Sequence, residues 1–158
     1  MTEDELYWRD ALAWSERQAD LLRRIARGER VNDVDWPHVI DEIEDVGISE
    51  LNAVRSLLRQ ALVHLLKAHA WPNDTACQHW RIEIAGFLDD AAARFAPSMR
   101  QRLDIDDLWR RACKQVDQTI MGDRPPGPLP DACPFTIDDL LAADRERLEQ
   151  RLAAAAPA

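Results

Sequence analysis

The residues best suited to chemistry in this sequence are two glutamates, Glu42 and Glu44, and two basic residues further along, His64 and Lys67. Glu42 and Glu44 flank the apolar face of one expected helix, while His64 lies at the edge of the apolar face of the next helix and Lys67 lies beyond it. Carboxylates and an imidazole at a half-buried helix seam can have pKa values shifted toward neutrality, which suits a general base or a metal ligand. The alternative is a set of ion pairs that fixes helix register, and we favour that interpretation.

Several motifs that catalysis or cofactor binding would require are missing from the sequence. It contains no Glu-x-x-His and no His-Glu-x-x-His, the patterns that place metal ligands on one face of a helix. It contains no G-x-S-x-G nucleophile motif, and its five glycines do not form a phosphate-binding loop. The cysteines Cys77, Cys113 and Cys133 have no C-x-x-C spacing and are expected to be reduced thiols. We therefore predict neither a cofactor nor a bound metal.

Tryptophan is abundant, with six in 158 residues, and most of the six fall on or beside helical stripes that predict a core position. Two differ from the rest. Trp8 lies about 100° around its helix from Tyr7, and Trp71 directly precedes a proline at a helix end. These two are the candidate contacts with a partner protein.

Composition narrows the function further. The net charge of −9 and the pI near 4.9 oppose binding to a phosphate backbone, so no nucleic-acid partner is expected. One local exception is the cluster of arginines between Arg23 and Arg30. Positive side chains are also favoured at the C-terminus of a helix, so this cluster does not by itself indicate nucleic-acid binding. No apolar run is long enough to span a membrane, and the acidic N-terminus is unlike a secretory signal, which together predict a cytoplasmic protein.

The elements that must position these residues are helices, because apolar residues recur at helical spacing and no segment alternates as a strand does. The first helix begins at a Thr2–Glu5 capping box and ends before Gly28, where a left-handed C-cap is expected. Further helices are expected over residues 35–46, 49–71, 74–96, 104–120 and 136–152, with Gly47 ending the second. A proline-rich connector, residues 123–135, precedes the last helix. The chain is thus expected to fold as one all-α domain over residues 1–158, a bundle of about five to six helices.

Three stretches of the sequence carry a resemblance to a known family. They are Glu42-Ile43-Glu44 followed by Gly47 and Ser49, His64-Leu65-Leu66-Lys67 followed by Trp71-Pro72, and Cys133-Pro134-Phe135-Thr136. Together with the tryptophan and leucine positions between them, they resemble the bacterial family called domain of unknown function 29 (DUF29). The chain departs from the family's usual residues at Asp41, His79 and Trp109. The resemblance implies an all-helical bacterial domain with no established activity.

Three functions therefore stay open, and whether the chain is an enzyme is undecided. The favoured one is a helical protein-interaction or structural module that binds a partner protein or a second copy of itself. The alternative is a small hydrolase-type enzyme, or a metal- or ligand-binding bundle, that uses Glu42 or Glu44 with His64. The least favoured is a nucleic-acid-associated regulator acting through the arginine cluster.

Overall fold

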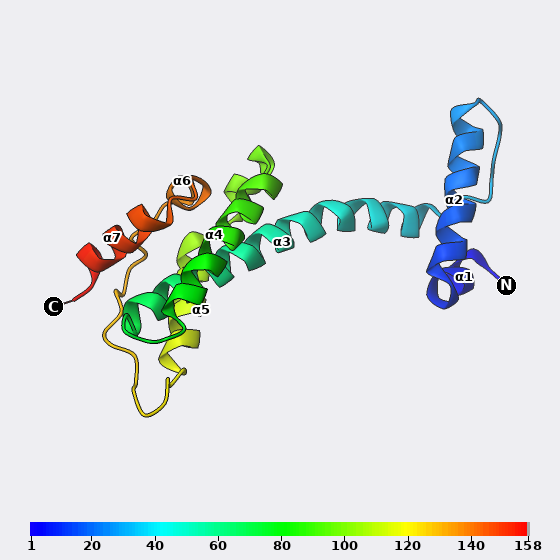
Figure 1. The fold of residues 1–158 in the computed structure, drawn as a ribbon. Helices are drawn as coiled ribbons and strands as arrows, with labels where there is room; N and C mark the ends of the chain where they lie inside the picture. The colour runs from blue at the N-terminus through cyan, green and yellow to red at the C-terminus, as the bar shows by residue number, and fades with distance from the viewer. Residues whose placement is uncertain (158) are drawn as a thin grey trace. The chain divides into compact units, whose positions relative to one another are not determined.

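The computed structural model describes residues 1–157, and helices form almost all of its regular structure (Figure 1). The elements in chain order are α1 (Glu3–Arg9), α2 (Ala11–Ala26), α3 (Trp36–Ala70), α4 (Cys77–Arg94), the 3-10 helix η1 (Pro97–Arg102), α5 (Ile105–Asp117), α6 (Ile137–Leu141) and α7 (Arg145–Ala155). The prediction of an all-α chain is confirmed, although the predicted five to six helices are slightly too few. None of the helices in the described part of the chain has the length and apolar character needed to cross a membrane.

The chain divides into two compact units, Met1–Ser49 and Glu50–Ala158, and each is described by itself. In the first unit, α1 begins at the expected capping box: Thr2 Oγ1 accepts the Glu5 N–H and a Glu5 carboxylate oxygen accepts the Thr2 N–H. The single helix predicted from here to Gly28 is wrong, because the chain breaks at Asp10. The backbone of Asp10 has φ −149°, and its carboxylate caps α2 by accepting the Ala13 N–H at 3.0 Å. Gly28, after α2, has the left-handed φ of 85° that was expected.

The predicted helix boundary at Gly47 is also wrong. α3 runs through Gly47 and Ser49 without interruption, so the two helices expected over residues 35–46 and 49–71 are one. A glycine inside a helix costs only about 1 kcal/mol relative to alanine, which the hydrogen bonds and packing of a long helix can offset. A proline would have stopped the helix, and the first proline after Gly47 is Pro72.

In the second unit, the leucine-rich end of α3 lies at the centre of the core. Leu58, Leu62, Leu65 and Leu66 are fully buried, together with Ile84 and Leu88 of α4 and Trp109 of α5. α6 and α7 pack on α4 and bury Leu140, Leu148 and Leu152. The hydrophobic contacts of this unit therefore extend over all of its helices.

The segment between α5 and α6 is held on this core by tryptophan side chains. The indole N–H of Trp109 donates to the carbonyl of Pro130, and that of Trp71 donates to the carbonyl of Arg124, each at 3.2 Å. Phe135 lies edge-on to the Trp109 ring. These contacts satisfy both indole donors inside the core.

Two helices stand where a single helix over residues 136–152 was predicted. Thr136 and Asp139 form a capping box at the start of α6, but Ala143 has a left-handed φ of 54° and ends the run. Asp144 then accepts the Arg147 N–H at 3.1 Å and starts α7. An aspartate with this capping ability competes with continuation of the helix.

Candidate functional site

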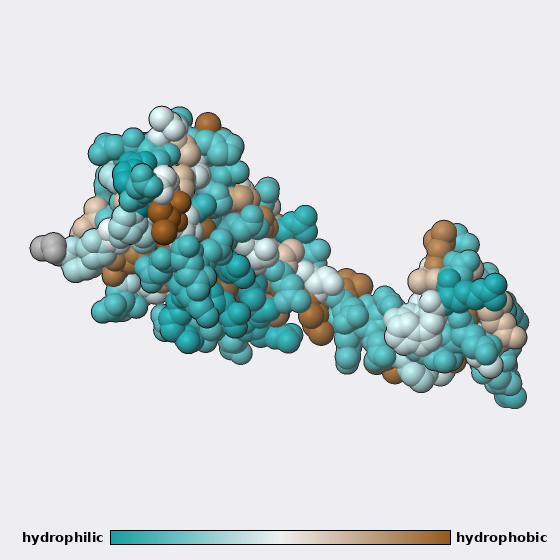
Figure 2. Space-filling model, turned by 90° about the horizontal axis from the view of Figure 1, so that it is seen from below, coloured by the Kyte–Doolittle hydropathy of each residue, from teal (hydrophilic) through white to brown (hydrophobic). Residues whose placement is uncertain are grey.

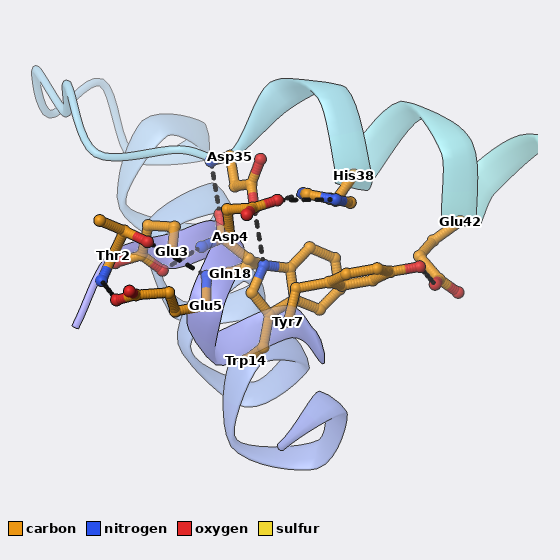
Figure 3. A network of polar contacts seen from close by, with 10 residues as sticks. All are labelled: Thr2, Glu3, Asp4, Glu5, Tyr7, Trp14, Gln18, Asp35, His38 and Glu42. Atoms are coloured by element: carbon orange, nitrogen blue, oxygen red, sulfur yellow. Dashed lines mark hydrogen bonds and ion pairs between the residues drawn. The ribbon is translucent and has the colours of Figure 1, made fainter. Parts of the chain in front are cut away.

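The most densely bonded polar cluster of the first unit lies where α1, α2 and the start of α3 meet (Figure 3). Its centre is Asp35, the residue before α3, whose side chain is only 9% exposed. Asp35 Oδ2 accepts the indole N–H of Trp14 at 3.0 Å and lies 2.8 Å from Nδ1 of His38. One carboxylate therefore fixes a residue of α2 and a residue of α3.

Gln18 of α2 forms a second link in this cluster, and only 2% of the residue is exposed. Its side-chain amide donates to Glu3 of α1 and its carbonyl oxygen accepts the backbone N–H of Asp35, both at 2.9 Å. Because both ends of the buried amide are satisfied, Gln18 joins three segments without leaving an unpaired polar group.

Tyr7 completes the cluster from α1. Its ring stacks on His38 with the ring centroids 3.9 Å apart, and its hydroxyl donates to Glu42 Oε1 at 2.7 Å. The hydrogen bond to Glu42 raises the pKa of Tyr7 to about 12, and partial burial and the charge of Glu42 act in the same direction. The Tyr7 hydroxyl therefore stays protonated at ordinary pH and acts as a hydrogen-bond donor.

The charge of Asp35 is set by opposing effects. Burial raises its pKa, but hydrogen bonds from His38 and Trp14, together with the electrostatic interaction with His38, outweigh burial and leave the pKa below the ordinary value. Asp35 is therefore an ionised anchor. His38 has both ring nitrogens engaged, Nδ1 by Asp35 and Nε2 by Asp4 at 3.5 Å. A histidine with both nitrogens engaged has no free nitrogen to act as a base, so this arrangement serves to hold helices together.

The four residues predicted to form a helix seam lie on one continuous helix and have other partners. Glu42 accepts the Tyr7 hydroxyl, and Glu44 is exposed. His64 Nε2 lies 2.8 Å from Glu83 of α4, while its Nδ1 is 2.9 Å from the carbonyl of Gln60. Lys67 lies over the Trp80 ring, with Nζ 5.7 Å from the ring centroid. Within residues 1–157, none of these four residues forms a hydrogen bond or ion pair with another of the four.

Several residues that matter in these clusters were not singled out by sequence reasoning. Glu83 lies between His64 and His79 and approaches His79 Nε2 at 3.3 Å. Its i, i+4 spacing from His79 was the only local signal. The sequence signal for Gln18 is clearer, because Gln18 is a polar residue in the middle of an apolar stripe. A buried side-chain amide at such a position needs hydrogen-bond partners.

The two tryptophans predicted to contact a partner have opposite environments. Trp8 of α1 is 75% exposed, whereas Trp71 is 3% exposed and belongs to the core of the second unit. Trp71 is therefore withdrawn as a contact residue. Pro72 ends the helix directly after Trp71. The indole ring of Trp71 points into the core, where its N–H donates to the carbonyl of Arg124.

Large apolar side chains are exposed on the first half of α3, although a helical bundle would bury them. Trp36 and Ile40 are each 51% exposed, and Ile43 and Val46 are each 68% exposed. Their spacing places them within one helical stripe, which we call the α3 face. The face of the molecule drawn in Figure 2 is largely hydrophilic, with hydrophobic side chains at scattered places.

The groups that could support metal or thiol chemistry are sparse. No group of three or more histidine, cysteine, aspartate or glutamate side chains in residues 1–157 is arranged to hold a metal ion. Cys77 is buried, and burial raises the pKa of Cys113 and Cys133 to about 11. Raised thiol pKa values mean little thiolate at neutral pH.

The fold and the sites define an all-helical protein with a polar cluster that joins its N-terminal helices and an exposed apolar helix face. Residues 6–145 match the model of the family described as Domain of unknown function DUF29. The chain belongs to this family, for which no activity is established. It is also similar to the crystal structure of an alpha-helical protein of unknown function from Rhodospirillum rubrum, with 31% sequence identity, a TM-score of 0.70, and coverage of 96% of this chain and 98% of that chain. No curated protein has a significant match.

Proposed function

We propose that this chain is a helical protein-interaction module and that the α3 face is its docking surface. The observation that carries the proposal is the exposure of Trp36, Ile40, Ile43 and Val46 on one stripe of a helix. Burial of apolar side chains against a partner would lower the free energy by about 25 cal/mol for every Å² of apolar surface that is covered. Several exposed large apolar side chains on one helical stripe are typical of interaction sites, although Val39 of the same stripe is buried.

The charge of the first unit supports a partner of opposite charge. Residues 1–49 contain 13 acidic and six basic residues, a net charge of −7, which is most of the charge of the chain. Glu44 borders the α3 face, and Asp41 and Asp45 lie further round the same exposed helix. A partner with an apolar stripe and positive flanks is complementary to this surface, whereas a second copy would bring like charges together. We therefore commit to a basic amphipathic helix of another protein as the occupant.

The polar cluster supports this role by fixing the start of α3. Asp35 and His38 lie beside Trp36, and they are bonded to α2 and α1. Glu42, one residue before Ile43, is held by Tyr7. A helix face that is ordered before binding loses less conformational entropy when the partner docks.

The proposal is tested with two synthetic amphipathic peptides that share one apolar face and differ only in having lysine or glutamate on their flanks. Calorimetric titration of the full-length protein should detect binding of the lysine peptide alone. Ile43→Glu should weaken that binding at least about tenfold, because it buries an unpaired charge in the interface. Ile82→Glu is the matched control, since Ile82 is similarly exposed, at 63%, but lies on α4.

Several outcomes would contradict the proposal. Equal binding of the two peptides, binding of neither, or an equal effect of Ile43→Glu and Ile82→Glu would each remove the α3 face as the docking surface. Dimers in sedimentation equilibrium that Ile43→Glu converts to monomers would show that a second copy is the occupant instead. Trp8 stays a separate candidate contact with the partner because it is exposed. The loss of peptide affinity in Trp8→Ala measures its contribution to binding.

No observation favours the hydrolase alternative in the form predicted from the sequence. It needs a glutamate and His64 at one seam, but Glu42 is bonded to Tyr7 and His64 to Glu83 and Gln60. Interaction is therefore the single function that we propose.

A further inference from the structure

A groove in the second unit gathers positive charge in an otherwise acidic chain. It has a volume of about 430 Å³ and lies between α3 and α5, with Arg102 at the end of η1 also lining it. Arg55 and Arg59, four positions apart, line it from α3, and Arg111 lines it from α5. Asp104 and Asp107 are its acidic residues. The groove therefore has four guanidinium groups and two carboxylates.

Both carboxylates of the groove already have partners. Asp107 accepts from Arg110 at 3.2 Å and from Arg111 at 2.7 Å. Asp104 caps α5 by accepting the Asp107 backbone N–H at 2.9 Å. Neither carboxylate forms an ion pair with the arginines that come from α3 and η1.

In the part of the chain that the structure describes, the other three arginines of the groove have only neutral hydrogen-bond partners or none. Arg55 donates to the side-chain oxygen of Asn52 and to the carbonyl of Arg102. Arg59 donates across the groove to the side-chain oxygen of Gln115 at 3.1 Å. Within residues 1–157, Arg55, Arg59 and Arg102 form no recorded ion pair with a carboxylate.

This arrangement is unusual for a chain with nine more acidic than basic residues, in which eleven arginines do form ion pairs with carboxylates. Three guanidinium groups without an acidic partner repel one another when they share one groove. An anion placed among them would relieve that repulsion and gain charge-assisted hydrogen bonds.

We propose that this groove binds a small molecule through its phosphate group. Guanidinium groups donate in a planar fork that matches the oxygen atoms of a phosphate, and several of them around one dianion give a stronger site than one alone. The volume of the groove lies within the usual range for small-ligand sites, roughly 300–1,000 Å³. Leu108, Asn52 and Ser56, which also line the groove, supply apolar and hydrogen-bonding contacts for the rest of the molecule. The inference is independent of the α3 face, since all the groove residues lie in Glu50–Ala158.

The test is a calorimetric titration of the full-length protein at constant ionic strength with inorganic phosphate, pyrophosphate, a sugar phosphate and the same sugar without its phosphate. The phosphate-bearing probes should bind and the unphosphorylated sugar should not. Arg59→Gln and Arg102→Gln should each weaken binding about tenfold, the effect of losing one charge-assisted hydrogen bond. Arg147→Gln is the matched control, because Arg147 is an exposed arginine of α7 outside the groove.

The arms of the experiment distinguish the source of the phosphate. Tighter binding of the sugar phosphate identifies an organic phosphate, and equal or tighter binding of inorganic phosphate identifies the free ion. Arg59→Lys, which keeps the charge but loses the fork, should retain only part of the affinity. Absence of binding by every phosphate probe at millimolar concentration, or an equal loss in Arg147→Gln, would overturn the proposal. Unchanged thermal melting of the variants shows that they are folded.

Discussion

The phenolic oxygen of Tyr7 lies 2.7 Å from Oε1 of Glu42, and this hydrogen bond joins α1 to α3 across 35 positions of the sequence. It accompanies the stacking of Tyr7 on His38, so two successive turns of α3 are held by one side chain of α1. The α3 face lies on this same stretch of helix. The bond therefore connects the polar cluster to the proposed docking surface.

Tyr7 offers a direct measurement of that bond, because it is the single tyrosine of the chain. Phenolate absorbance should rise with a midpoint near pH 12, the pKa to which Glu42 raises it. Glu42→Gln should move the midpoint toward the ordinary value of about 10. A raised tyrosine pKa stabilises the fold below the unfolded pKa, and that contribution is lost as the pH rises through about 12. A midpoint near 10 in the unaltered protein would contradict the Tyr7–Glu42 hydrogen bond.

Asp35 should make the first unit sensitive to acid. The pKa of Asp35 in the folded protein lies below the ordinary value of 3.8. Its contribution to the free energy of unfolding is therefore present above pH 3.8 and is lost as the pH falls below that value. The indole N–H signal of Trp14, followed by NMR, should shift as this carboxylate is protonated. Asp35→Asn should destabilise the first unit, whereas Asp33→Asn, at an exposed neighbouring position, should not. If the Trp14 signal changes neither with acid nor in Asp35→Asn, Asp35 does not accept the hydrogen bond from the Trp14 indole.

Gly47 tests the continuity of α3. A Cβ atom at this position would meet no neighbouring atom within 4 Å, and the backbone is helical. Gly47→Ala should therefore stabilise the helix by about 1 kcal/mol, measured by denaturant unfolding followed by circular dichroism. Gly28→Ala should do the opposite, because Gly28 has a left-handed φ of 85° that alanine adopts poorly. A loss of stability in Gly47→Ala would indicate a non-helical backbone there.

The cysteines should react slowly in the folded protein. Burial raises the pKa of Cys113 and Cys133 to about 11, and Cys77 is buried in the core. At pH 8 a pKa near 11 leaves about a hundredfold less thiolate than the ordinary value of 9.0 would. A thiol-specific reagent should thus label the native chain slowly and the denatured chain fast. Rapid labelling of Cys133 in the native protein would show that its burial is not maintained.

Local signals in the sequence were sufficient for some of the helix starts and for some of the helix ends. The capping box at Thr2, the helix start expected at residue 136 and the left-handed Gly28 all formed as predicted. These features depend on residues three or four positions apart, so they act wherever the rest of the chain lies. The family resemblance was likewise visible in contiguous motifs, and the match over residues 6–145 confirms it.

Local signals failed where two of them competed. Asp10 ends one helix and caps the next inside an apolar pattern that suggested one helix, while Gly47 continues a helix that the pattern suggested should stop. A capping aspartate and a helical glycine each change the free energy by only about 1 kcal/mol. Packing and hydrogen bonds to distant residues therefore decide such positions.

The sequence by itself determined the all-helical class, the family, and the residues capable of chemistry. Only the tertiary structure decided which of those residues meet: Glu42 with Tyr7, and His64 with Glu83. It also decided that Trp71 is buried while Ile43 is exposed. The physical reason is that helical periodicity fixes the face on which a residue lies, whereas the element that covers that face is chosen by long-range packing.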